Sequence, residues 1–171
     1  MRCADDKGIQ GGFTLVEILI TLVILGILLV LAVGNFRGMN EKYKVEAETK
    51  QLYADLMDAR GRAMQRDRVF FVQINGNDYQ TYEDTSPAPD GDGALQNTDT
   101  LAVNVKVSHT VVTGNIAVPL SFTFNRNGIA SVTGFIRFSS TAKPDYDCIW
   151  IRSTRIKMGQ YNATGNTCAE K

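Results

Sequence analysis

The pattern of apolar and polar residues changes twice along the chain and divides it into three parts. From Ile18 to Val33 no residue is charged, and only Thr21 and Gly26 interrupt the aliphatic side chains and alanine. Together with residues 13–16 this makes about twenty apolar residues, roughly what a helix needs to cross ~30 Å of hydrocarbon. We therefore expect residues 13–34 to form a transmembrane helix.

The second part, residues 35–67, predicts an amphipathic helix that continues the first. Apolar residues recur there with heptad-like spacing and charged residues fill the gaps. The stripe consists of Val45, Leu52, Leu56, Ala59 and Ala63, widened by Tyr43, Ala47 and Ala54. We expect the helix to end near Gln65 or Asp67, with Gly34 and Gly38 as points where it could bend, because glycine costs up to ~1 kcal/mol in a helix interior.

From residue 68 onward the apolar period becomes two, which predicts strands. We expect them at 68–74, 79–83, 101–107, 110–112, 121–125, 135–139, 148–152 and 155–158, with turns at Asn75-Gly76 and Asn127-Gly128. No later helix is indicated. The expected fold class is α+β, in which a long N-terminal helix packs on an antiparallel β-sheet or β-sandwich formed by residues 68–171.

One carboxylate, Glu17, lies inside the apolar run. An ionisable group at that depth costs ~2.5–3.5 kcal/mol on insertion scales, so such a group usually has a partner and a function. Residues 1–12, which precede the run, are short and polar and end in Gly11-Gly12. A secretory signal has its apolar region before the cleavage site, whereas here the small residues come first. The alternatives are an uncleaved signal anchor with a chance glutamate, or a conventional signal cleaved after Gly34.

The Gly12-Phe13 junction, the polar leader before it and Glu17 as the fifth residue after it resemble the class III leader of type IV prepilins and type II secretion pseudopilins. The resemblance implies cleavage after Gly12 by prepilin peptidase and N-methylation of Phe13. It also implies that Glu17 pairs with the free amine of a neighbour's Phe13 in a helical filament. The expected partners are other pilins or pseudopilins and the inner-membrane assembly platform. The expected location is the bacterial inner membrane, with the N-terminus cytoplasmic and the globular domain periplasmic.

The β part carries a second resemblance. Residues 59–72, the segment Phe122–Gly128 with the strand after it, and Ile149–Lys157 are similar to the GspH/FimT group of minor pilins and pseudopilins. This implies a structural subunit of a pilus or of a secretion pseudopilus. Two narrower alternatives are a DNA-binding minor pilin for DNA uptake and a pseudopilin that contacts exported proteins.

Composition adds two constraints. The formal net charge of the 171 residues is zero, so nothing global favours a nucleic acid partner. Of three cysteines, Cys3 lies in the leader, and Cys148 and Cys168 form the remaining pair in a part that would be exported. We expect a disulfide bond between them. Closing the loop of about twenty residues would stabilise the protein by roughly 3 kcal/mol.

Two local clusters have competing interpretations. The loop Asp84–Thr100, with Asp90-Gly91-Asp92-Gly93, is interpreted as a solvated, mobile loop, and calcium is the alternative because carboxylates and glycines suit an oxygen-rich site. Arg152, Arg155 and Lys157 form a basic cluster that is either a solvated strand face or a DNA-binding site, as in the FimT branch.

No arrangement of residues indicates catalysis. The chain has one histidine, His109, no glycine-rich phosphate loop and no nucleophilic serine motif. We expect no enzyme activity, no cofactor and no metal site.

Overall fold

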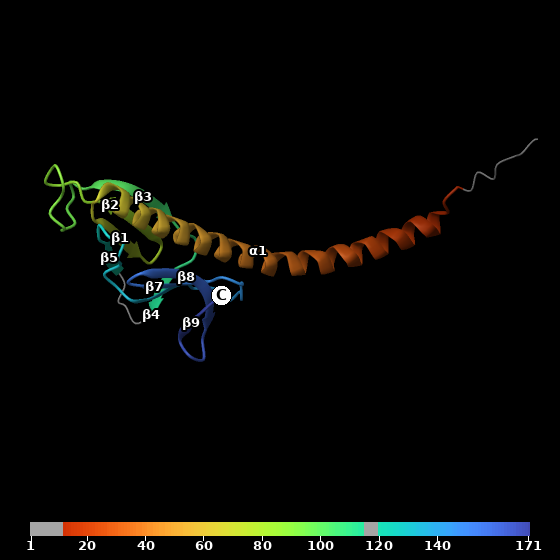
Figure 1. Cartoon of the computed structure of the whole chain (residues 1–171). Helices are drawn as coiled ribbons and strands as arrows, with labels where there is room; N and C mark the ends of the chain where they lie inside the picture. Colours follow the sequence, from red (N-terminus) through yellow and green to blue (C-terminus); the bar gives the residue numbers. More distant parts are fainter. Residues whose placement is uncertain (1–11, 115–119) are drawn as a thin grey trace, which may run out of the picture. The chain divides into compact units, whose positions relative to one another are not determined.

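The structure is a computed structural model that describes residues 12–114 and 120–171, except for the side chains of residues 31–37 (Figure 1). The chain divides into two compact units with the boundary between Met39 and Asn40. Among the described residues the secondary structure consists of one helix, α1 (Leu15–Arg66), followed by the strands β1 to β9. Each unit is described below by itself.

Both ends of α1 carry recognisable caps. At the N-terminus the hydroxyl of Thr14 accepts a hydrogen bond from the backbone N–H of Glu17 at 3.3 Å, as an N-cap side chain does. At the C-terminus Asp67 has a φ of 54°, and the N–H of Arg68 donates to the carbonyl of Ala63 at 3.2 Å. This is the bond of a Schellman cap. The helix therefore ends where the sequence predicts.

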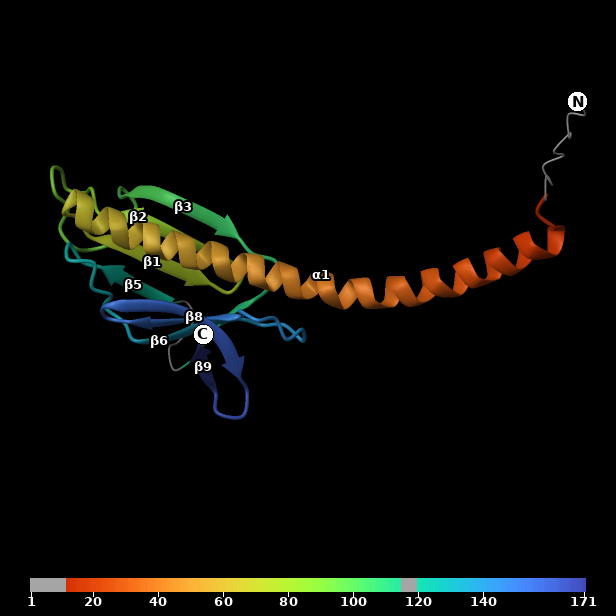
Figure 2. The same cartoon turned by 45° about the vertical axis from the view of Figure 1, so that its right-hand side comes forward.

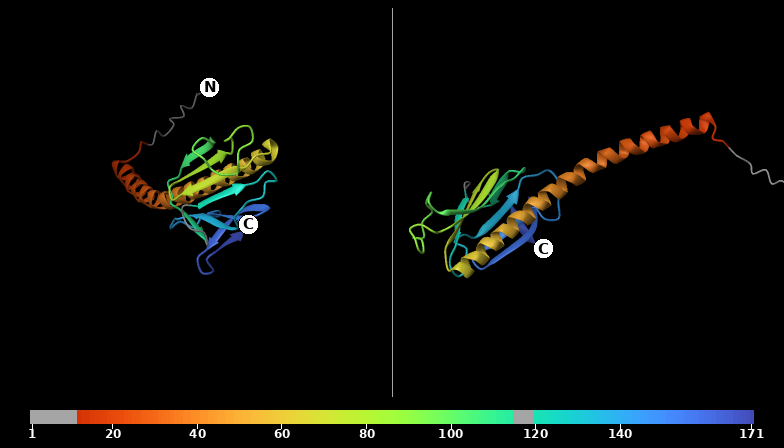
Figure 3. Two further views of the ribbon diagram at one scale, coloured as in Figure 1. Left: turned by 90° about the vertical axis from the view of Figure 1, so that its left-hand side faces the viewer. Right: turned by 90° about the horizontal axis from the view of Figure 1, so that it is seen from above.

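Residues 68–114 and 120–171 form two antiparallel sheets, which Figure 3 shows beside the helix. The first has the strand order β3-β2-β1-β5 and the second has the order β4-β6-β7-β8-β9. The bounds are β1 Phe70–Asn75, β2 Asp78–Glu83, β3 Thr100–Lys106, β4 Val111–Gly114, β5 Leu120–Phe124, β6 Gly134–Phe138, β7 Cys148–Arg152, β8 Arg155–Asn162 and β9 Thr167–Glu170. The expected α+β fold with antiparallel sheets is confirmed.

One hydrophobic core joins the helix to both sheets within residues 40–171. The five residues of the predicted helical stripe are all buried, with exposed fractions of 0–2%. The predicted widening of the stripe is wrong, because Tyr43, Ala47 and Ala54 are exposed. Thr49 and Tyr53 lie inward instead, and the Thr49 hydroxyl is satisfied by the Val45 carbonyl at 2.8 Å, so a polar residue occupies the core side without penalty.

Three details of the sheets differ from the predictions. The strand β8 extends to Asn162, beyond the expected end at residue 158. Asn75 pairs with Asp78, so the turn between β1 and β2 consists of Gly76 and Asn77, one residue later than expected. The strand β9 was not expected, because it is four residues long and only Cys168 is buried in it. A single buried position gives no periodic signal.

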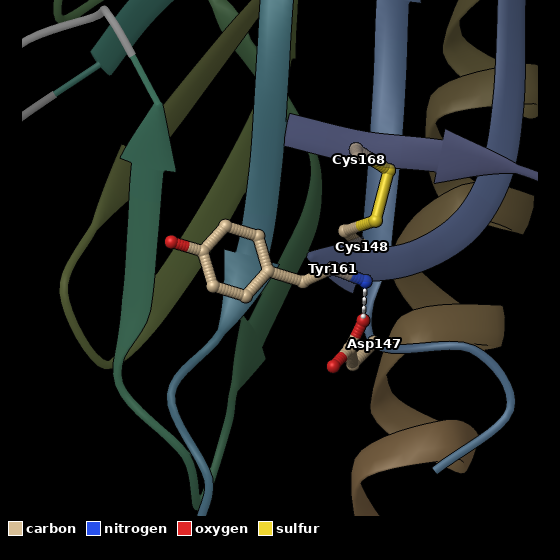
Figure 4. The surroundings of a disulfide bond; sticks show 4 residues. All are labelled: Asp147, Cys148, Tyr161 and Cys168. Carbon is tan, nitrogen blue, oxygen red and sulfur yellow. Dashed lines mark hydrogen bonds between the residues drawn. A yellow bond between two sulfur atoms is a disulfide. The ribbon is translucent and has the colours of Figure 1, made fainter. Parts of the chain in front are cut away.

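The β8–β9 hairpin is held to the rest of the second sheet by a disulfide bond between Cys148 and Cys168, which confirms the predicted pairing (Figure 4). The two cysteines and Phe135 form a small buried cluster, against which Trp150 and Tyr161 pack. The backbone N–H of Tyr161 donates to the Asp147 carboxylate beside the disulfide at 2.6 Å. Burial raises the pKa of the Asp147 carboxyl above its ordinary value, although this hydrogen bond acts in the opposite direction.

Candidate functional site

Gly12 and Phe13 are exposed and lie outside regular secondary structure, immediately before α1. The Phe13 side chain is 79% exposed. A Cβ added to Gly12 would meet no atom within 4 Å. Packing within the chain therefore does not require a glycine at this position. The geometry leaves this junction accessible to another protein.

The first turns of α1 present apolar side chains on all sides. Within residues 13–30 the exposed fractions of the large apolar side chains run from 49% to 80%. They are Phe13, Leu15, Val16, Ile18, Leu19, Ile20, Leu22, Val23, Ile24, Leu25, Ile27, Leu28, Leu29 and Val30. Glu17 is exposed among them and is the only charged residue in this run. A continuous apolar surface of this extent requires a partner.

Among the residues that the structure describes, no helix is both long enough and apolar enough to cross a membrane.

The expected transmembrane segment, residues 13–34, includes positions 31–34, whose side chains lie outside the described residues. It stays a prediction.

The basic cluster lies on the β7–β8 hairpin. Arg152 pairs with Arg155 across the two-residue turn. Glu170 on β9 approaches Lys157 at 2.7 Å and Arg152 at 3.7 Å, and the hydrogen bond from Lys157 lowers the pKa of the Glu170 carboxyl. Arg155 is exposed and makes no ion pair within the described part of the chain. One carboxylate thus contacts two of the three cations and offsets one of the three positive charges.

The acidic loop is organised by its own carboxylates. The buried carboxylate of Asp84 accepts hydrogen bonds from the N–H groups of Asp92 and Gly93, and that of Asp99 accepts from those of Thr85, Ser86 and Gln96.

In the ranges 12–114 and 120–171, no group of three or more histidine, cysteine or acidic residues could hold a metal ion. Asp84 and Asp99 therefore order the loop by capping backbone amides, which gives no support to the calcium interpretation.

The structure reveals a cluster that sequence reasoning missed. His109 follows β3, and its side chain is 10% exposed. Its Nδ1 lies 2.7 Å from Glu48 and its Nε2 lies 2.7 Å from Glu41, both on α1. Burial alone would lower the pKa of His109, but the hydrogen bonds to Glu41 and Glu48 outweigh burial and raise it. In the sequence these residues are a lone histidine and two glutamates seven residues apart on a helix. Only the three-dimensional structure shows that the histidine contacts both glutamates.

The helix, the two sheets and the N-terminal junction define a pilin-like subunit, and comparison with known proteins is consistent with that class. Residues 8–33 match the model of the prokaryotic N-terminal methylation motif. Residues 48–154, more than half of the chain, match the model of the type II transport protein GspH. The chain belongs to the GspH family, whose members are structural subunits and not enzymes.

A solved structure has a similar fold. The type IV minor pilin FimU of Pseudomonas aeruginosa superposes with a TM-score of 0.51 at 14% sequence identity, covering 70% of this chain and 91% of FimU. No curated protein sequence matches the chain significantly. The chain is therefore a minor pilin or pseudopilin of the GspH/FimT type.

Proposed function

We propose that the chain is cleaved after Gly12 and then assembles through its N-terminal helix into a type IV pilus or a type II secretion pseudopilus. The observation that carries this proposal is the run of exposed apolar side chains from Phe13 to Val30 with one carboxylate in it. Lipid would cover this surface before assembly, with the domain on the periplasmic side of the inner membrane. Packed helices of neighbouring subunits would cover it afterwards. Prepilin peptidase and an inner-membrane assembly platform would act on the chain in turn.

Glu17 would fix the register between subunits. Cleavage after Gly12 leaves the amine of Phe13, or its N-methylated form, as a cation at the start of the helix. A carboxylate that is buried without a partner is heavily penalised, so the filament is stable only where Glu17 of one subunit meets this amine of another.

The test is Glu17→Gln, which keeps the shape of the side chain and removes its charge. Membrane insertion and leader cleavage should be unchanged, whereas cross-linking into filaments should fall at least tenfold relative to the unmodified protein. Thr21→Val, one turn further along, is the matched control and should assemble normally, because the Thr21 hydroxyl donates to the Ile18 carbonyl of its own helix at 2.8 Å. Normal filament entry by Glu17→Gln would refute the role of the carboxylate.

We do not extend the proposal to DNA uptake. Glu170 forms ion pairs with Arg152 and Lys157, and Arg155 has no ion pair among the described residues. The one carboxylate cancels one of the three positive charges, so the cluster has a net charge of +2. So small a charge gives little counterion release, and counterion release is the main source of affinity for DNA.

A further inference from the structure

The two sheets have four edges, and they are protected unequally. An open edge presents unpaired backbone N–H and C=O groups that can pair with another chain, so proteins usually cover or shorten it. The edges here are β3 and β5 in the first sheet and β4 and β9 in the second. The strands β4 and β9 have only four residues each.

The edge of β5 is covered by the chain itself. The N–H of Ser131 donates to the Thr123 carbonyl at 2.9 Å, and the Ser131 hydroxyl accepts from the Thr123 N–H at 2.9 Å. The next residue, Phe124, forms a bridge with Ala130. The segment 129–131 therefore acts as a short cover strand along β5.

Within residues 12–114 and 120–171, no segment covers the edge of β3 in this way. It is the longest of the four edge strands, with seven residues, Thr100–Lys106. It lies on the outside of its sheet in Figure 2. No hydrogen bond from the described residues reaches its outer side. Its sequence, Thr-Leu-Ala-Val-Asn-Val-Lys, is rich in residues that favour strands, and it carries one charge.

The register shows which backbone groups point outward. The N–H of Val107, the residue after β3, donates to the Asn77 carbonyl at 2.9 Å. Val105, two residues before Val107, pairs with Tyr79 of β2. Because alternate residues of an antiparallel pair direct their N–H groups to opposite sides, those of Asn104 and Lys106 point to the open edge.

The side chains define the partner further. Leu101 is 48% exposed and offers an apolar contact near the start of the edge. Lys106, at its other end, makes no ion pair within the described part of the chain. A second copy of β3 would not bring an acidic partner to Lys106. Antiparallel pairing about Val103 places Thr100 of the other copy opposite Lys106, and parallel pairing in register places the two lysines side by side.

We propose that β3 is a docking site for an extended segment of a different polypeptide, which adds as a fifth strand to the first sheet and brings an acidic residue opposite Lys106. Main-chain hydrogen bonds from Asn104 and Lys106 would supply much of the affinity, and Leu101 and Lys106 would supply the selectivity. The inference rests on sheet geometry and is independent of the proposed assembly through the helix.

The probe is a capped seven-residue peptide of alternating threonine and valine with aspartate at its first position, which faces Lys106 in antiparallel pairing. We would measure amide hydrogen exchange in the full-length protein in detergent micelles. The peptide should slow exchange at Asn104 and Lys106, and a version with lysine in place of aspartate should bind roughly two- to fivefold more weakly, the range of an exposed ion pair.

Two variants make the test specific. Asn104→Pro removes an outward N–H and should abolish peptide protection, whereas Asn104→Thr keeps the N–H and should retain it. If Asn104→Pro fails to fold, Lys106→Glu decides, because it should reverse the preference between the two peptides. Absence of protection at millimolar peptide, or a preference that Lys106→Glu leaves unchanged, would overturn the proposal. Protection that rises with protein concentration without peptide would identify a second copy as the occupant and would also overturn it.

Discussion

At the scale of single residues, His109 links the segment after β3 to the helix. Each of its ring nitrogens lies 2.7 Å from a carboxylate oxygen, and Glu48 also accepts the N–H of Ser108 at 2.7 Å. A neutral imidazole has one N–H and can satisfy only one of the two carboxylates, whereas the imidazolium donates to both. The arrangement therefore favours the protonated ring. Glu48 also acts on Tyr79 of β2, whose pKa is raised by burial and by Asp55 and, to a smaller extent, by Glu48.

This predicts a pH dependence with a definite sign. The pKa of His109 is raised in the folded state above 6.5, so its contribution to stability is fully present below pH 6.5 and is lost as pH rises through the folded pKa. Urea unfolding of the full-length protein between pH 5.5 and pH 9 should show a stability that falls across this window. His109→Gln should flatten that part of the curve. Parallel curves for the two proteins would contradict the prediction.

At the scale of elements, Gly159 in β8 shows how closely β9 packs against β8 in the second sheet. A Cβ at Gly159 would lie 2.1 Å from the Ala169 carbonyl oxygen and 3.1 Å from the Cys168 sulfur. The backbone of β9 thus approaches β8 more closely than any side chain allows. Gly61 in α1 is the opposite case, because a Cβ there meets nothing within 4 Å.

Alanine at these two positions should therefore act in opposite directions. Gly159→Ala should destabilise the protein by about 1–3 kcal/mol through overpacking and should leave more free thiol at Cys148 and Cys168. Gly61→Ala should stabilise it by roughly 0.5–1 kcal/mol, since glycine is unfavourable in a helix interior. Urea unfolding and thiol labelling measure the two effects. A Gly159→Ala variant as stable as the unmodified protein would show that the close approach at Gly159 is absent. A loss of stability in Gly61→Ala would contradict the prediction for the helix.

The elements also differ in how well the sequence predicts them. Val45, Leu52 and Leu56 repeat with a helical period, so their burial was predictable. Tyr43 has the right chemistry for the stripe but lies on the solvent side, 64% exposed, and Thr49 is buried despite its hydroxyl. Whether Tyr43 and Thr49 are buried depends on which face of the helix meets the sheets. The spacing of apolar residues along the sequence does not determine that face at its margins. The partners of His109 are still less predictable, because they lie more than sixty residues away in sequence.

At the scale of the whole molecule, the disulfide bond closes a loop with a sequence separation of 20 residues and joins β7 to β9. Removing it with Cys148→Ala and Cys168→Ala together should lower the free energy of unfolding by roughly 3 kcal/mol, chiefly by freeing the unfolded chain. Reduction of the unmodified protein should give the same midpoint in urea. A reduced protein as stable as the oxidised one would contradict this expectation.

The shared core has a practical consequence for producing residues 40–171 apart from the N-terminal part of α1. Both sheets bury apolar residues against the helical stripe that begins at Val45, so a fragment that starts after Arg66 would leave those faces bare in water. A fragment that starts at Asn40, the first residue of the second compact unit, keeps the stripe and also keeps Glu41 for His109. The shortest version suited to crystallisation in water therefore begins there, with nearly half of α1 removed.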